Sequence, residues 1–199
     1  KEQDLSVRTR ALEETPEQQL LCDQFVHGVE KEDGSLERLV FHNEDKFNFA
    51  FDIVDGLARR EPDKLAMVHV ANDMTERRFT FKDMKDASSQ AANYFTSLGV
   101  KRGDRVMLVL KRHYQFWFAI LGLHKLGAIA IPATNQLMEH DFAYRFKAAG
   151  VSAIVCTADG DTAHQVDIAE ADAGVHLTKV LVGGKRAGWH DFDAEYGLF

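Results

Sequence analysis

The sequence predicts an α/β fold, in which a layered and mostly parallel sheet carries helices on both faces. Apolar runs of strand length alternate with segments whose apolar residues recur at helical spacing. The connections between these segments are short, as expected for parallel strands joined by helical crossovers. A closed barrel of this kind needs about 250 residues. Because the chain has 199 residues, we expect an open, doubly wound sheet.

An acidic arm precedes this pattern. The first 47 residues carry 6 basic and 12 acidic side chains, a net charge of −6, whereas the other 152 carry 18 and 19, a net charge of −1. Apolar residues at 20–29 have helical spacing and follow Thr15-Pro16-Glu17, so we predict a partly helical arm. We therefore divide the chain into an arm, residues 1–46, and an α/β body, residues 47–199.

The body opens with a helix, a hairpin and a second helix. Asn48 is a suitable N-cap for the first helix. This helix should end at Glu61-Pro62, because the residue before a proline avoids helical geometry. Thr80 and Asp83 have the spacing of a capping box for the second helix, which Gly99 closes. The strands of the hairpin are expected at residues 66–70 and 77–80.

Strands and helices then alternate. Residues 106–110 form a continuous apolar run, which is typical of a strand buried on both faces. The segment 114–126 is apolar nearly all round, so this helix should be largely buried. The remaining strands are expected at residues 128–131, 152–156 and 179–182, and the remaining helices at 139–149 and 162–173.

The composition argues against several classes of protein. A net charge of −7 disfavours a nucleic-acid-binding protein, which should carry a basic surface. The longest strongly apolar run, residues 116–123, is shorter than the about 20 residues of a membrane span. Cys22 and Cys156 lie far apart without metal-ligand spacing, so we favour two free thiols in a reducing cytoplasm over one disulfide.

Common catalytic motifs are absent from the sequence. It contains no Gly-x-Gly-x-x-Gly, no Walker loop and no Gly-x-Ser-x-Gly elbow. Gly183-Gly184-Lys185 lacks a following Ser or Thr and is interpreted as a turn. The nine histidines show no metal-binding spacing, and we interpret His69 and His124 as structural. We therefore assign no catalytic residue and no metal ligand.

Two local features could contact a ligand. Basic residues flank the strand at 106–110, in the segments 101–105 and 111–112, where they could attract an anion or form a solvated rim. The loop at residues 132–137 follows a buried strand, at the edge where open α/β sheets bind ligands, and offers a hydroxyl and two amides. From the residues alone, the ordinary interpretations, a solvated rim and a polar connection, are favoured.

Short motifs occur along the chain in a characteristic order: Phe47-Asn48-Phe49-Ala50, Ser89-Gln90-Ala91-Ala92-Asn93, Arg102-Gly103-Asp104-Arg105-Val106, Phe116-Trp117, Leu126-Gly127-Ala128, Ile131-Pro132-Ala133-Thr134-Asn135-Gln136-Leu137, Tyr144-Arg145-Phe146, Ala153-Ile154-Val155 and Gly188-Trp189-His190-Asp191-Phe192. This succession resembles the AMP-forming acyl-CoA synthetases of the adenylate-forming superfamily, and above all their medium-chain members. The resemblance covers roughly residues 47–197, so the body should be the N-terminal subdomain of such an enzyme.

The resemblance implies a two-step reaction. A carboxylate attacks the α-phosphate of ATP to give an acyl-adenylate and pyrophosphate, with Mg²⁺ on the phosphates, and the CoA thiol then displaces AMP. The family's phosphate loop ending in Pro-Lys, its later nucleotide motifs and its C-terminal catalytic lysine are absent from this sequence. The chain should therefore be an N-terminal, truncated part of the AMP-binding domain, and we predict that it is inactive in isolation.

Gln136 is the residue that the resemblance assigns to CoA, because the glutamine of the matching loop lies at the CoA site of medium-chain synthetases. The arginine pair of acetyl-type relatives has no counterpart at residues 163–166, which argues against a strict acetyl-CoA synthetase. The implied partners are a carboxylic acid, ATP and CoA. An acetate- or benzoate-activating ligase stays an alternative.

Two other classes of function stay open. The chain could be a stand-alone nucleotide- or CoA-binding module, if the natural protein ends near Phe199. The arm could instead serve oligomerisation, if the apolar positions at residues 20–29 pack on another subunit.

Overall fold

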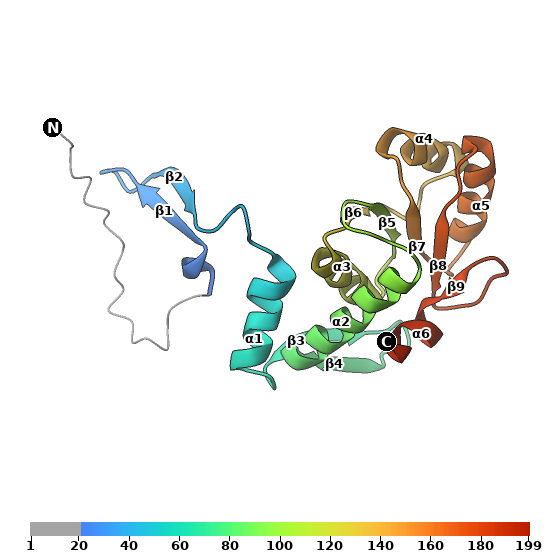
Figure 1. The fold of residues 1–199 in the computed structure, drawn as a ribbon. Helices are drawn as coiled ribbons and strands as arrows, with labels where there is room; N and C mark the ends of the chain where they lie inside the picture. Colours follow the sequence, from blue (N-terminus) through green and yellow to red (C-terminus); the bar gives the residue numbers. More distant parts are fainter. Residues whose placement is uncertain (1–20) are drawn as a thin grey trace. The chain divides into compact units, whose positions relative to one another are not determined.

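A computed structural model describes residues 21–199 of the chain (Figure 1). Contacts within the chain divide it into two units, and the division falls between Phe47 and Asn48. No helix in the described part of the chain is long and apolar enough to cross a membrane.

Residues 21–47 contain an antiparallel hairpin. A short helix, η1 (Leu21–Gln24), precedes strands β1 (Val26–Glu30) and β2 (Leu36–Phe41). The prediction of a helix across residues 20–29 is therefore wrong where the chain forms the strand β1. The predicted helix start, Thr15-Pro16-Glu17, lies outside the described residues.

The turn of this hairpin explains the error. Gly34 has a φ of +79°, and the Asp33 carboxylate accepts hydrogen bonds from the backbone N–H and the hydroxyl of Ser35, at 2.9 and 2.6 Å. An Asp-Gly pair favours a tight reversal of the chain. Cross-strand hydrogen bonds then satisfy the backbone, and they outweigh a short apolar pattern that also suits a helix.

The second unit is built on a five-stranded sheet in which every neighbouring pair is parallel. This confirms the predicted α/β class. The strand order is β6-β5-β7-β8-β9. The strands are β5 (Arg105–Val109), β6 (Ile129–Pro132), β7 (Ala153–Thr157), β8 (Thr178–Val182) and β9 (His190–Asp191). The two-residue strand β9 was not predicted, because it is too short to show a pattern.

Helices cover both faces of this sheet (Figure 1). Val106 and Leu108 of β5 pack into one core with residues of α2 and α3, whereas Met107 and Val109 pack into a second core with residues of α4 and α5. The helical segments are η2 (Ala50–Val54), α1 (Asp55–Arg60), α2 (Phe81–Ser97), α3 (Gln115–Leu126), α4 (Glu139–Ala149), α5 (Thr162–Ala173), α6 (Phe192–Glu195) and η3 (Tyr196–Leu198). Burial on both faces explains the continuous apolar sequence of β5.

A second hairpin, β3 (Leu65–Val70) and β4 (Glu76–Thr80), forms a separate antiparallel pair beside the core of α2 and α3. It leads into α2 through the predicted capping box. The Thr80 hydroxyl accepts from the N–H of Asp83 at 3.1 Å, and the Asp83 carboxylate accepts from the N–H of Thr80 at 2.8 Å. The capping box thereby satisfies two backbone N–H groups where β4 ends and α2 begins.

The topology has a switch point at the carboxyl edge of the sheet, between β5 and β7. From β5 the chain passes through α3 to β6, and from the neighbouring β7 it passes through α5 to β8. Because α3 and α5 lie on opposite faces, the loops after these two strands diverge. Such a switch point is where open α/β sheets bind ligands.

Candidate functional site

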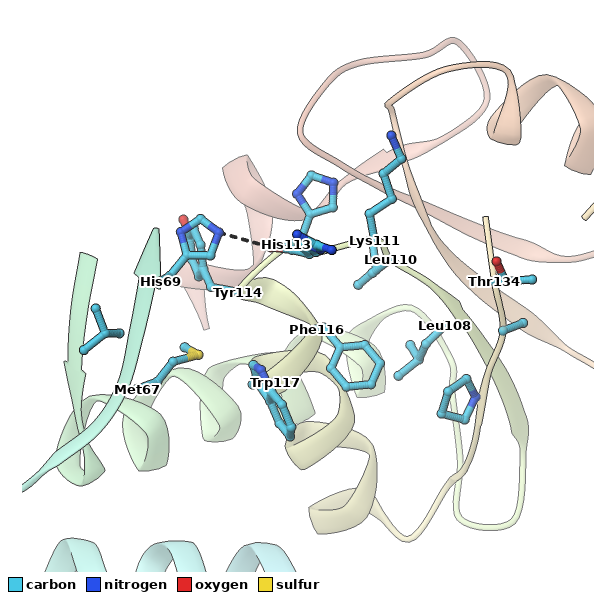
Figure 2. Close-up of a pocket in the computed structure, with 14 residues that line it drawn as sticks. Met67, His69, Leu108, Leu110, Lys111, His113, Tyr114, Phe116, Trp117 and Thr134 are labelled. Atoms are coloured by element: carbon cyan, nitrogen blue, oxygen red, sulfur yellow. Dashed lines mark hydrogen bonds between the residues drawn. The ribbon is translucent and has the colours of Figure 1, made fainter. Parts of the chain in front are cut away.

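A cleft of about 600 Å³ opens at this edge, beside the ends of β5 and β6 (Figure 2). Strand β3, the loop after β5, the first turn of α3 and the loop after β6 form its walls. Its volume is within the range of small-molecule sites, about 300–1,000 Å³. In Figure 2, Leu108, Phe116 and Trp117 lie together on one side, and His69, Lys111 and His113 lie on the other. The cleft therefore has an apolar part and a polar part.

His69 joins the β3 wall to the loop after β5. Its Nε2 lies 3.1 Å from the carbonyl oxygen of Arg112. Because a carbonyl only accepts, Nε2 carries a proton and donates it. Nδ1 is buried and has no hydrogen-bond partner within residues 21–199. The ring also packs edge-on against Tyr114, with centroids 5.3 Å apart. His69 therefore packs between β3 and the loop after β5, at the wall of the cleft.

His113 joins the loops after β5 and β7. Its Nε2 lies 2.7 Å from Oγ1 of the buried Thr157, which also accepts from the N–H of Asp159 at 3.1 Å. Burial lowers the pKa of His113, although the nearby carboxylates of Asp159 and Asp193 oppose this effect. His113 is therefore neutral at pH 7, and it holds the two diverging loops together without adding charge.

Lys111 and Arg112 supply the positive charge of the cleft, and both are exposed. Arg105, at the opposite end of the same strand, is used differently. Its Nε donates to the carbonyl oxygens of Ala149 and Gly150, both at 3.1 Å. The two basic segments that the sequence placed around this strand therefore have different roles, one structural and one at the cleft.

The loop after β6 reaches the cleft through Thr134 and not through Gln136. Gln136 is exposed, and its backbone N–H donates to Oγ1 of Thr134 at 3.3 Å. The carbonyl of the intervening Asn135 accepts from the Thr162 hydroxyl at 3.4 Å, which connects the loop to the start of α5. The CoA contact of Gln136 stays a prediction.

Sequence reasoning missed the apolar half of the cleft. Met67 comes from β3, and Trp117 from the first turn of α3. The exposed fraction of Trp117 is 49%. The available signal was a large aromatic residue at the start of an apolar helix, which we interpreted as part of the buried face.

The described residues do not assemble a metal centre. Within residues 21–199, no three His, Cys, Asp or Glu side chains are arranged to hold a metal ion. We therefore assign no Mg²⁺ ligand to these residues. The two thiols are free, and burial raises the pKa of Cys156 to about 12, which makes this thiol unreactive at neutral pH.

Comparison with known proteins identifies the family. The model of the AMP-binding enzyme family matches residues 54–195. Mitochondrial acyl-coenzyme A synthetase ACSM2 of Rattus norvegicus is 34% identical over 157 residues, which are 75% of this chain and 27% of the relative. Mitochondrial acyl-coenzyme A synthetase ACSM5 of Mus musculus is 37% identical over 153 residues, 73% of this chain and 26% of the relative.

Solved structures agree on the fold. The crystal structure of Brucella canis acyl-CoA synthetase matches with a TM-score of 0.64 and 24% identity, over 76% of this chain and 27% of that chain. This chain spans about a quarter of the length of the curated relatives that it matches, and the match lies in their N-terminal quarter. The chain belongs to the AMP-binding, adenylate-forming enzymes, and the medium-chain acyl-CoA synthetases are among its relatives.

Proposed function

We propose that the chain is the N-terminal part of an ATP-dependent acyl-CoA synthetase that activates a medium-chain fatty acid. The observation that carries this proposal is the family match over residues 54–195, together with 34% and 37% identity to two acyl-coenzyme A synthetases. The substrates are then the acid, ATP and CoA. The acid attacks the α-phosphate of ATP and pyrophosphate leaves, after which the CoA thiol attacks the acyl carbonyl and AMP leaves.

In this reaction the nucleophile and the leaving group both belong to the substrates. This chain therefore contributes by binding and positioning the substrates. The cleft at the carboxyl edge of the sheet supports that role, because it combines an apolar wall with the positive charge of Lys111 and Arg112. His69 and His113 hold its walls, and burial lowers the pKa of His113, so this imidazole adds no positive charge at pH 7.

ATP–pyrophosphate exchange tests the proposal. Exchange is measured for the 199-residue chain and for the longest protein encoded by its gene. Octanoate, benzoate and acetate are tested in turn as the acid. We expect exchange only in the longer protein, and most strongly with octanoate. Exchange by the 199-residue chain would contradict the predicted inactivity, and a longer protein inactive with every acid would contradict the function. Preference for benzoate or acetate would refute the medium-chain assignment.

Gln136→Ala tests the proposed CoA contact in the longer protein. Loss of one hydrogen bond of about 1 kcal/mol should raise the KM for CoA about fivefold. The adenylation half-reaction should be unchanged, because CoA enters after it. Gln24→Ala, at an exposed position in the first unit, is the matched control. An unchanged KM for CoA in Gln136→Ala would remove this residue from the site.

The arm, residues 1–46, is proposed as a segment separate from the α/β portion, residues 47–199. We also propose a cytoplasmic location, because Cys22 is a free and exposed thiol. Cell fractionation tests the location. Recovery in mitochondria, the compartment of both relatives, would contradict it.

A further inference from the structure

Two histidines meet on one face of the first hairpin, in a part of the chain that the family model does not match. Nε2 of His42 lies 2.9 Å from Nδ1 of His27. The register pairs His27 with Val40, and the N–H of His42 donates to the carbonyl oxygen of Phe25. Because residues two apart along a strand share a face, the two imidazoles are diagonal neighbours across the hairpin.

The separation of these two nitrogens suits a metal ion that takes both as ligands. Bonds of about 2.0–2.1 Å from a metal to imidazole put two nitrogens about 2.9 Å apart at a right angle, and about 3.3 Å apart at a tetrahedral angle. The observed 2.9 Å is within this range. The ring centroids are 4.8 Å apart, so the rings approach each other through the edges that carry these nitrogens.

The ligand type and the local charge select the class of metal. Imidazole is a good ligand for Zn²⁺, Cu²⁺ and Ni²⁺, whereas Mg²⁺ and Ca²⁺ prefer oxygen ligands. Residues 21–47 contain seven Asp or Glu and three Lys or Arg, so this unit attracts cations. The paired nitrogens and the negative charge therefore favour a divalent transition-metal ion.

The hairpin also has little else to stabilise it. No residue between 21 and 47 is buried, and a two-stranded hairpin alone is only marginally stable in water. His27 belongs to β1, and His42 directly follows β2. A metal ion bound to both would connect the two strands and stabilise the folded hairpin by its binding free energy.

We propose that His27 and His42 bind a divalent transition-metal ion of the Zn²⁺ class, which clamps β1 to the end of β2. Nδ1 of His27 and Nε2 of His42 are the two protein ligands, and water occupies the other coordination positions. The proton that the two nitrogens share in the metal-free hairpin moves through water to the outer nitrogen of its own ring. Both rings then bind as neutral imidazoles.

Calorimetric titration with Zn²⁺ tests the site on the 199-residue chain, purified without a histidine tag. We expect one site of micromolar affinity for Zn²⁺, and no binding of Mg²⁺ at the same concentrations. His27→Gln and His42→Gln should each weaken Zn²⁺ binding about a hundredfold, because loss of one ligand removes the advantage of two linked contacts. Glutamine can still hydrogen-bond, so the substitutions separate metal binding from a merely hydrogen-bonded pair.

Matched variants locate the metal. His140→Gln combined with His176→Gln makes the same chemical change at two exposed histidines of the second unit, and it should leave Zn²⁺ affinity unchanged. Cys22→Ser removes the exposed thiol of the first unit and should also leave it unchanged. Circular dichroism checks that each variant is folded.

Hydrogen–deuterium exchange measures the clamp itself. Zn²⁺ should slow the exchange of amides in β1 and β2 of the original chain, because a bound metal reduces local opening of the hairpin. The same addition should have no effect on these amides in His42→Gln. Unchanged exchange in the original chain at saturating Zn²⁺ would contradict the clamp.

Several calorimetric results would overturn the site. These are Zn²⁺ binding only at millimolar concentrations, full affinity in His27→Gln, or equal weakening by the control double variant. A loss in Cys22→Ser as large as in the histidine variants would contradict a site of two histidines. The result is independent of the proposed function, since pyrophosphate exchange by the longer protein is measured without reference to this site.

Discussion

The two ends of strand β5 both carry basic residues and use them differently. At the amino end, Arg105 binds the carbonyls of Ala149 and Gly150, where α4 terminates. At the carboxyl end, Lys111 and Arg112 lie exposed at a cleft beside the start of α3. A helix that ends leaves unpaired carbonyls, and a helix that begins leaves unpaired N–H groups. In a parallel α/β sheet, basic side chains therefore become structural at one edge and available to ligands at the other.

The largest expected effect is at the amino end. Arg105→Met removes donors from the Ala149 and Gly150 carbonyls and from that of Gly103 at 3.3 Å, so it should lower the unfolding free energy by about 2–3 kcal/mol. Urea unfolding measures the loss. A loss below about 0.5 kcal/mol would show that Arg105 is no more structural than a surface charge.

Gly150→Ala tests the same contact from the helix side. Gly150 has a φ of +58°, and a Cβ there would lie 2.7 Å from Nη2 of Arg105. Gly174 also ends a helix, with a φ of +63°, but a Cβ there would meet nothing within 4 Å. Both alanine variants should lose about 1–2 kcal/mol of unfolding free energy to backbone strain. Gly150→Ala should lose more, and equal losses would mean that Arg105 moves aside at no cost.

A lower pH should reduce the unfolding free energy through His113, which lies just beyond the carboxyl end of β5. Its pKa in the folded chain is below the usual 6.5, because burial disfavours the charged imidazole. The stabilising contribution is then complete above pH 6.5 and is lost as the pH falls from 6.5 through the folded pKa. Unfolding free energies at pH 7.5 and 5.5 should differ less in His113→Gln than in the original chain. A residual difference is expected from His124, whose pKa is also lowered by burial. Identical differences would exclude His113.

The smallest effect on stability is expected at the rim of the cleft. Lys111→Gln combined with Arg112→Gln should change the unfolding free energy by less than about 0.5 kcal/mol, because both side chains are exposed. A stability loss comparable to that of Arg105→Met would contradict the difference between the two ends of β5.

Local signals explain which elements could be predicted. The Thr80–Asp83 capping box depends on residues three apart, and it is present as expected. The apolar run at β5 also predicted a doubly buried strand, because a parallel sheet hides both faces. The first hairpin was mistaken for a helix, since a short apolar run suits either structure and the Asp33-Gly34 turn was not recognised.

The candidate site was less predictable than the fold. The sequence placed the loop containing Gln136 at the carboxyl edge of the sheet. The loop follows a predicted strand, and the carboxyl ends of parallel strands lie at one edge. The sequence could not place Thr134 in the cleft and Gln136 outside it. Nor could it show that Arg105 and Lys111, which flank one strand, would meet different partners.

By itself, the sequence determined a parallel α/β layer, the order of its elements and the resemblance to adenylate-forming enzymes. These depend on periodicity, caps and motifs, which are properties of neighbouring residues. Only the tertiary structure decided that β3 would bring Met67 and His69 beside the loop after β5. That contact joins segments about forty residues apart in the chain, and the packing of the β3–β4 hairpin against the core of α2 and α3 determines it.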